Sequence, residues 1–215
     1  MTRAADRLVE TIRAHGLDRI FCVPGESYLS LLDALHGSEI ELVVCRHEGG
    51  AGFMAVADAR LTGRAGLAAV SRGPGATNAS IAVHLANQDA VPLVLLVGQV
   101  ARFERGRGAF QEVDYQQMFG GMAKGIWEVT EAERLSETFA RAVHVAESGT
   151  PGPVILAMPE DMLGDTVTDP AVPILPVARA SVSQEDARKA ADLLAKAERP
   201  LLVAGGQLDT PHGRA

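Results

Sequence analysis

The sequence lacks the features of membrane, secreted and nucleic-acid-binding proteins. The 215-residue chain contains no run of 18 apolar residues, and its first 16 residues carry charges at helical spacing instead of the apolar core of a signal peptide. Lysine and arginine are scattered singly, apart from "RFERGR" at 102–107, and the formal net charge is -7. We therefore expect no signal peptide, no membrane span and no nucleic-acid partner.

Cysteine is also scarce. Cys22 and Cys45 each end an apolar run, where a buried, reduced thiol is the simplest interpretation, and a cytoplasmic location fits it. No second Cys/His pair has the spacing of metal ligands, so we predict no metal site in this chain. Ser71 lacks the G-x-S-x-G turn of hydrolases, which argues against a serine nucleophile.

Helix and strand patterns alternate along the first 160 residues. The segments between the apolar runs have helical patterns and end at glycine or a turn. Strands that are apolar throughout are typical of a parallel sheet covered on both faces. We predict a doubly wound α/β fold with six mostly parallel strands. The apolar runs lie at 19–23, 40–45, 66–71, 92–98 and 152–158, and the helical patterns at 2–15, 28–36, 48–61, 76–88 and 131–148.

The chain is predicted to contain more than one domain. We expect a first domain at 1–165 and a linker at 166–182, where prolines interrupt the pattern. Residues 183–215 then show a capped helix, a strand and a Gly-Gly turn, which is the beginning of a further α/β domain. In a parallel sheet, ligands bind outside the carboxyl ends of the strands, so the loops at that edge of the first domain are the place to search for a site.

One of these loops, "GPGATN" at 73–78, resembles a nucleotide-binding turn only in part. It begins like G-x-G-x-x-G, but Asn78 stands in place of the third glycine, and Pro74 removes a backbone donor. No clear acidic residue follows at the next strand end to bind a ribose. A tight strand-to-helix turn is favoured, and a dinucleotide-binding domain, which would bind NAD, stays as an alternative.

A second loop, "CRHEGG" at 45–50, places Glu48 at the start of a helix. As a first-turn glutamate it would complement the helix dipole, an ordinary structural role. Its neighbours Gly49, Gly50, Ala51 and Gly52, however, supply almost no side-chain volume and disfavour a helix. This pattern fits a carboxylate that exchanges a proton with the nitrogen of a bulky ligand. Taken alone, the residues leave both roles open.

The order of several motifs strongly resembles the N-terminal, pyrimidine-binding domain of thiamine-diphosphate enzymes of the acetolactate synthase type. The resemblance covers about residues 3–165, and residues from 183 onward look like the start of that family's central domain. The motifs are "VPGE", "CRHEGGA", "LTGR", "SRGPGATNAS", "DAVPLVLLVGQV", "AFQEVD" and "GPVILAMPEDM".

The resemblance implies a catalytic role for Glu48. In the family, the corresponding glutamate binds N1' of the aminopyrimidine and so activates the cofactor, which decarboxylates a 2-keto acid such as pyruvate and ligates the product to an acceptor. Other residues would be carried over by position. Pro24 and Gly25 would lie close to the cofactor, Gly73, Pro74 and Asn78 near its pyrimidine, and Phe110 and Gln111 would line the substrate pocket.

The resemblance also implies that this chain holds half of a site. It has no G-D-G followed later by Asn, the motif that binds Mg2+ and the diphosphate, because its Gly164-Asp165 precedes Thr166. The diphosphate-binding domain of a neighbouring subunit, in a homodimer or homotetramer, would supply that half, and the chain alone would be inactive. Whether FAD binds stays open, because its usual contacts lie mainly in the central domain.

The substrate is left open as well. Gly49 and Phe53 replace a glutamine and a histidine that many acetolactate synthases carry in this motif. Another thiamine-diphosphate-dependent 2-keto acid decarboxylase or C-C lyase, and a non-catalytic protein of the same fold, therefore remain as alternatives.

Overall fold

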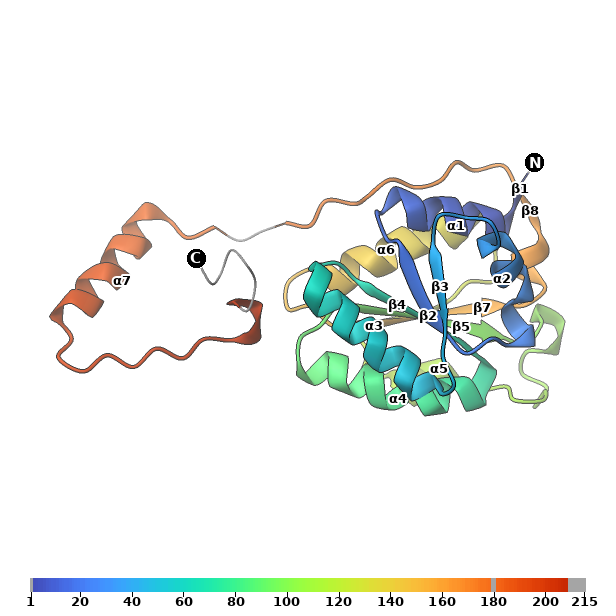
Figure 1. Cartoon of the computed structure of the whole chain (residues 1–215), viewed down its shortest axis with the longest axis horizontal. Coiled ribbons are helices and arrows are strands. Elements are labelled where there is room, and N and C mark those ends of the chain that lie inside the picture. The colour runs from blue at the N-terminus through green and yellow to red at the C-terminus, as the bar shows by residue number, and fades with distance from the viewer. Residues whose placement is uncertain (1, 179–180, 209–215) are drawn as a thin grey trace. The chain divides into compact units, whose positions relative to one another are not determined.

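The computed structural model describes residues 2–178 and 181–208, in two compact units of residues 1–176 and 177–215 (Figure 1). The first unit contains a parallel sheet in the order β3-β2-β4-β5-β7-β6 and a small antiparallel pair, β1 with β8. The predicted doubly wound α/β fold is confirmed. Its strands are β1 (Thr2–Arg3), β2 (Arg19–Cys22), β3 (Glu41–Val44), β4 (Gly66–Ser71), β5 (Leu93–Gln99), β6 (Gly125–Glu128), β7 (Pro153–Pro159) and β8 (Thr166–Val167).

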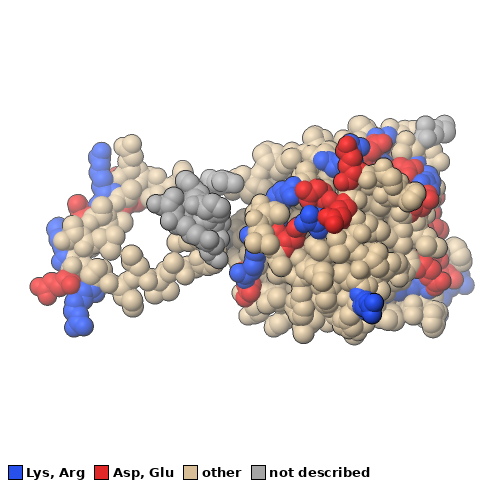
Figure 2. All heavy atoms as spheres, viewed as in Figure 1, with Lys and Arg blue, Asp and Glu red and all other residues tan. Residues whose placement is uncertain are grey.

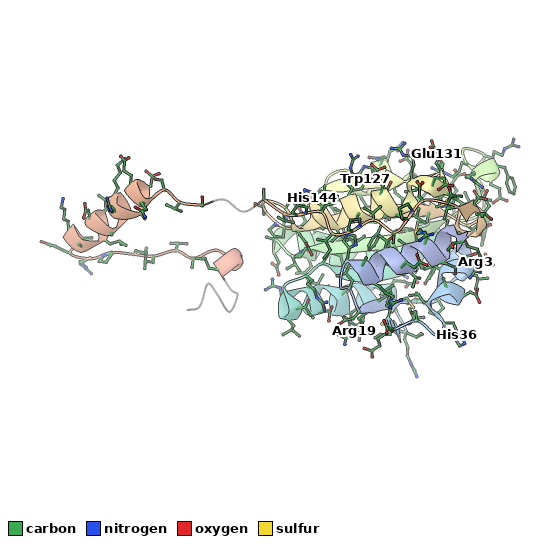
Figure 3. The ribbon with its side chains drawn as sticks, turned by 90° about the horizontal axis from the view of Figure 1, so that it is seen from above. Arg3, Arg19, His36, Trp127, Glu131 and His144 are labelled. Carbon is green, nitrogen blue, oxygen red and sulfur yellow. The ribbon has the colours of Figure 1, made fainter. Side chains whose placement is uncertain are left out.

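Helices cover both faces of the sheet because successive residues of a strand point to opposite sides. In β5, Val94 and Leu96 pack with α1, α2 and α6, whereas Leu93, Leu95 and Val97 pack with α3, α4 and α5. Figure 3 looks onto the first of these faces and shows α1 between α6 and α2. The helices are α1 (Ala4–Ala14), α2 (Leu29–Leu35), α3 (Glu48–Thr62), α4 (Arg72–Gln88), α5 (Tyr115–Phe119) and α6 (Leu135–Glu147).

Two elements differ from the sequence prediction. The sixth strand, β6, is a short edge strand that pairs with β7 and has only half-buried residues, so its sequence shows no strong apolar run. Helix α4 begins at Arg72 instead of residue 76, so the predicted "RGPG" turn forms its first turn. Pro74 is accepted there because the first backbone N–H groups of a helix have no partner within it.

The second unit contains one α-helix, α7 (Gln184–Lys196), among its described residues. Ser183 caps it as predicted, since its Oγ accepts a hydrogen bond from the Asp186 N–H at 3.0 Å. The strand predicted after this helix is not formed at residues 201–205, where no neighbouring strand is available for pairing. The boundaries predicted for the linker and the further domain stay a prediction.

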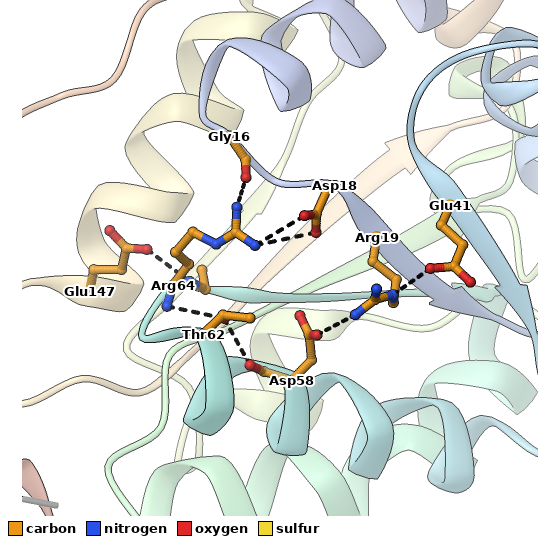
Figure 4. A network of polar contacts seen from close by, with 9 residues as sticks. Gly16, Asp18, Arg19, Glu41, Asp58, Thr62, Arg64 and Glu147 are labelled. Carbon is orange, nitrogen blue, oxygen red and sulfur yellow. Dashed lines mark hydrogen bonds and ion pairs between the residues drawn. The ribbon is translucent and has the colours of Figure 1, made fainter. Parts of the chain in front are cut away.

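The far end of α3 is anchored at the amino edge of the sheet by an ion-pair network (Figure 4). Arg19 of β2 donates to Glu41 of β3 at 2.7 Å and to Asp58 of α3 at 2.8 Å. Arg64, just after the helix, donates to the Gly16 carbonyl and to Asp18. Because this end is fixed to β2, the first residue of α3 is held at the opposite, carboxyl edge of the sheet.

We expect Asp58→Asn to lower the free energy of unfolding, because among the described residues the Arg19 guanidinium then keeps Glu41 alone as an anionic partner. Asp89→Asn is the matched control, since it weakens the more exposed Arg60–Asp89 pair and should cost less than about 0.5 kcal/mol. Urea unfolding followed by circular dichroism measures both. Equal losses would show that the Asp58 contact does not anchor α3.

Candidate functional site

The predicted loops meet at the first turn of α4, at the carboxyl edge of the sheet. The Gly73 N–H donates to the Gln111 carbonyl at 3.0 Å, which joins α4 to the loop after β5. The Ser71 and Ser27 hydroxyls lie 2.8 Å apart and join α4 to the loop after β2. At Gly25 the two loops are so close that a Cβ atom would lie 2.3 Å from Cβ of Ser71. Glycine is therefore required at 25 by packing.

Glu48 is the first residue of α3 and reaches across to α4. Its Oε2 accepts a hydrogen bond from Nδ2 of Asn78 at 2.9 Å, which joins two of the predicted site residues. The capping role is filled by the preceding residue, because Nδ1 of His47 accepts from the Gly49 N–H at 3.0 Å. Glu48 is half-buried, and its Oε1 accepts no hydrogen bond within the described residues. One carboxylate oxygen thus remains available to a ligand.

The glycines that follow Glu48 serve packing more than ligand access. A Cβ atom at Gly52 would lie 2.4 Å from Cβ of Ala82, and one at Gly49 would lie 3.2 Å from the Asn78 carbonyl oxygen. The interpretation that these residues leave room for a ligand is therefore wrong for Gly49 and Gly52, because the His47 ring and α4 occupy the space beside Gly49, and α4 occupies the space beside Gly52. At Gly50, a Cβ atom would meet nothing within 4 Å.

Gly75 lies close to Oε1 of Glu48, the oxygen without a hydrogen-bond partner among the described residues. A Cβ atom at this position would lie 3.7 Å from Oε1 of Glu48 and 3.2 Å from Cβ of Val70. A side chain larger than alanine would therefore crowd the strand or the carboxylate. The absence of a side chain leaves Oε1 uncovered on the α4 side.

The remaining predicted residues lie on the same loops. Pro24, Pro74 and Phe110 are exposed, and the side chain of Phe110 is 75% exposed. Gln111 is half-buried and has φ = 65°, in the left-handed region that a non-glycine residue rarely adopts. The structure thus brings the backbones of 73 and 111 together and leaves the Phe110 ring free.

Arg72 belongs to this region and was not singled out from the sequence. It is 8% exposed, has φ = 45°, and pairs with Glu26 at 3.2 Å and Glu160 at 2.7 Å. A cation at the start of a helix is unfavourable, and the two carboxylates from neighbouring loops offset this. The signal that could have found it is a charged residue directly between a buried strand and Gly-Pro-Gly.

The two thiols differ in their surroundings. Both are free, and Cys22 is buried whereas Cys45 is half-buried. Burial raises the pKa of the Cys22 thiol to about 11, so it stays protonated at neutral pH. The two side chains pack on opposite faces of the sheet, Cys22 with α1 and Cys45 with α3 and α4.

Residues 2–178 and 181–208 contain neither a candidate metal site nor a candidate membrane span. No group of three or more His, Cys, Asp and Glu side chains in these residues could hold a metal ion. No helix among them is long and apolar enough to cross a membrane.

Comparison with known families shows which family the chain belongs to. The family model described as "Thiamine pyrophosphate enzyme, N-terminal TPP binding domain" matches residues 2–118, more than half of the chain and all the predicted site residues. The chain belongs to this family. The predicted resemblance to thiamine-diphosphate enzymes is confirmed.

Its relatives include acetolactate synthase large subunits. The chain is 34% identical over 211 residues to the probable large subunit of Methanocaldococcus jannaschii, covering 95% of this chain and 36% of the relative. It is 35% identical over 204 residues to the isozyme 2 large subunit of Escherichia coli, covering 94% and 37%. The chain thus spans about a third of the length of these relatives.

A solved structure shows the same fold. The thiamine diphosphate-dependent 4-hydroxybenzoylformate decarboxylase of Rhodococcus jostii RHA1 superposes with a TM-score of 0.90 at 26% sequence identity. The match covers 96% of this chain and 40% of the decarboxylase.

The packing of α3 against α4 gives a prediction with a built-in control. Gly52→Ala should destabilise the protein by about 1–3 kcal/mol, because the added methyl group overlaps Ala82. Gly50→Ala, in the same helix but facing open space, should stabilise it by about 0.5–1 kcal/mol through helix propensity. Thermal unfolding measures both. Stabilisation by Gly52→Ala would show that α3 and α4 are not in close contact there.

Proposed function

We propose that this chain is the pyrimidine-binding module of an acetolactate synthase-like enzyme, which decarboxylates a 2-keto acid such as pyruvate and ligates the product to an acceptor. The single observation that carries the proposal is the Glu48–Asn78 contact, which holds a carboxylate with one free oxygen at the carboxyl edge of the sheet. It occurs within the part of the chain that matches the thiamine pyrophosphate family.

The residues present fit thiamine diphosphate. Asn78 orients Glu48 through Oε2, so Oε1 is the atom that would share a proton with a pyrimidine nitrogen. Gly75 leaves that oxygen uncovered, and Gly25 and Gly73 lie in the loops that meet at the first turn of α4. Pro24 and Pro74, which precede or follow these glycines in the sequence, are exposed. When bound, the cofactor supplies the electron sink for decarboxylation, and the residues of this chain orient it and hold the proton.

The proposal assigns the other half of the site to a partner. A diphosphate-binding domain of a neighbouring subunit, with Mg2+, would complete the site in a cytoplasmic homodimer or homotetramer. The surface supports a large partner, because Figure 2 shows a broad area with few charges where Figure 1 places α3 and α4. Large apolar side chains are exposed on β3, α3 and α4, and an apolar surface on neighbouring elements is typical of an interface. They are Val44, Phe53, Met54, Leu61 and Ile81.

A second reaction within the same class is favoured by one observation. The superposed structure is that of a 4-hydroxybenzoylformate decarboxylase, whose name gives an aromatic 2-keto acid as substrate. Decarboxylation without ligation is therefore the alternative for the enzyme that contains this chain. Product analysis with pyruvate and with benzoylformate separates the two, and exclusive use of benzoylformate would overturn the acetolactate synthase-like assignment.

Glu48→Gln should lower thiamine-diphosphate-dependent turnover about 10²–10⁴-fold, because the amide cannot take up the proton that the carboxylate exchanges. The assay uses the chain joined to, or mixed with, a diphosphate-binding domain. Glu137→Gln is the matched control, since Glu137 is also a first-turn glutamate, on α6, and should leave turnover unchanged. Full turnover in Glu48→Gln would favour a role in folding alone.

A further inference from the structure

The loop between β5 and α5, residues 100–114, is organised around one carboxylate. The Glu112 side chain is 9% exposed and accepts hydrogen bonds from the backbone N–H groups of Gly106 at 2.6 Å and Ala109 at 3.1 Å. Nη1 of Arg105 also donates to it. Three donors from the same loop therefore converge on one side chain. They lower the pKa of Glu112, with the Gly106 amide as the largest cause, so the group is ionised at neutral pH.

Arg105 connects this carboxylate to the sheet. Its Nε and Nη2 donate to the two oxygens of Glu128, at 2.5 Å and 2.7 Å. Such two-pronged pairing fixes the direction of a guanidinium as well as its position. Because Glu128 is the last residue of β6, the chain of contacts Glu128–Arg105–Glu112 ties the loop to the edge strand of the sheet.

The stem of the loop is held separately. Gln99, which is fully buried, donates its Nε2 to the Val113 carbonyl at 3.1 Å and accepts from the Val100 N–H at 2.9 Å. The Gln111 carbonyl is bound by the Gly73 N–H of α4. Residues on both sides of Phe110 are thus immobilised by hydrogen bonds, while the ring of Phe110 itself is 75% exposed.

The backbone of this loop is also strained at one residue. Gly106 and Gly108 have φ of 75° and 65°, which glycine accepts without cost, but Gln111 has φ = 65° with a side chain. That conformation costs about 1–2 kcal/mol for a non-glycine residue and persists only where surrounding contacts impose it. Glu112, the next residue, supplies such contacts. A strained residue and an exposed aromatic ring on a fixed loop are typical of a preorganised recognition surface.

We propose that Glu112 is a positioning residue, which acts through Arg105 and the loop amides to hold Phe110 and Gln111 in place for the substrate. The inference rests on the proposed function for the role of Phe110 and Gln111. The clamp, which is formed by Glu112, Arg105 and Glu128, is inferred from their hydrogen bonds and does not depend on the proposed function.

Limited proteolysis tests the clamp on the 215-residue chain itself, because the loop contains trypsin sites at Arg105 and Arg107. Glu112→Gln should raise the rate of cleavage after these residues about 10-fold, since the amide gives up the charge-assisted bonds to Arg105 and Gly106. Glu104→Gln is the matched control in the same loop. The Glu104 carboxylate makes no hydrogen bond or ion pair in the described part of the chain, and cleavage should match the wild type.

Mass spectrometry of the fragments gives both rates, and circular dichroism confirms that each variant is folded. If Glu112→Gln does not fold, Glu128→Gln replaces it, because it weakens the link from Arg105 to β6 and leaves the contacts of Glu112 in place. It should raise cleavage to a smaller extent. An unchanged rate in a folded Glu112→Gln or Glu128→Gln variant overturns the clamp.

The clamp should also depend on pH in a stated direction. Because the folded pKa of Glu112 is lowered, its stabilising contribution is fully present above the ordinary glutamate pKa of about 4.3 and is lost as the pH falls through the folded value. Protection of the Gly106 and Ala109 amides from hydrogen exchange should therefore fall in acid in the wild type. In Glu112→Gln it should be low at every pH, and equal protection in the two proteins contradicts the proposal.

A double-mutant cycle tests positioning in the active enzyme assembled as described above. Glu112→Gln should raise the KM for pyruvate about 10-fold and leave the affinity for thiamine diphosphate unchanged. In a Phe110→Ala background it should have little further effect, because both changes disturb the same contact. Full additivity, or an equal loss of cofactor affinity, overturns the positioning role. If the proposed function is wrong, the wild type shows no cofactor-dependent turnover, whereas the proteolysis result is unaffected.

Discussion

The close contact between α3 and α4 is the constraint on which the site depends. These helices approach until Gly52 faces Ala82 and Gly49 faces the backbone at Asn78; a Cβ atom would overlap Ala82 at Gly52 and would be crowded at Gly49. Only at this separation can the short side chain of Asn78 reach Glu48 at 2.9 Å. The same packing leaves one oxygen of Glu48 free. The packing of α3 against α4 therefore sets the orientation of the proposed catalytic carboxylate.

The two edges of the sheet have different roles: one holds α3 in place, and the other carries the candidate site. At the amino edge, Arg19 and Arg64 fasten the end of α3 to β2 through carboxylates and backbone carbonyls, which positions the helix without any ligand chemistry. At the carboxyl edge, the starts of α3 and α4, the Gly25 and Gly73 backbones and the strained residues Arg72 and Gln111 form the candidate site. Strain of this kind is expected where a backbone is arranged for binding instead of for stability. This division agrees with the general location of ligand sites in doubly wound folds.

Much of the fold could be predicted because the strands are buried on both faces and therefore read as apolar runs. Three features could not be predicted, because their residues lack an apolar run or suit more than one structure. Strand β6 lies at an edge, where Gly125 and Glu128 are acceptable, so its sequence resembles a loop. The "RGPG" segment looks like a turn because glycine and proline disfavour helices, but the first turn of a helix tolerates both. The glycines after Glu48 resemble a gap for a ligand in the sequence, whereas His47 and α4 fill the space beside two of them.

The sequence by itself determined the class of fold, the order of its elements, the family and the loops that carry the candidate residues, because these depend on local pattern and on motifs at set separations. The tertiary structure decided which of these residues meet. The contacts of Glu48 with Asn78 and of Glu112 with Arg105 and Glu128 join residues from different helices, loops and strands. Such contacts depend on how far two elements approach each other. That distance is set by packing across the whole domain, and no short stretch of sequence records it.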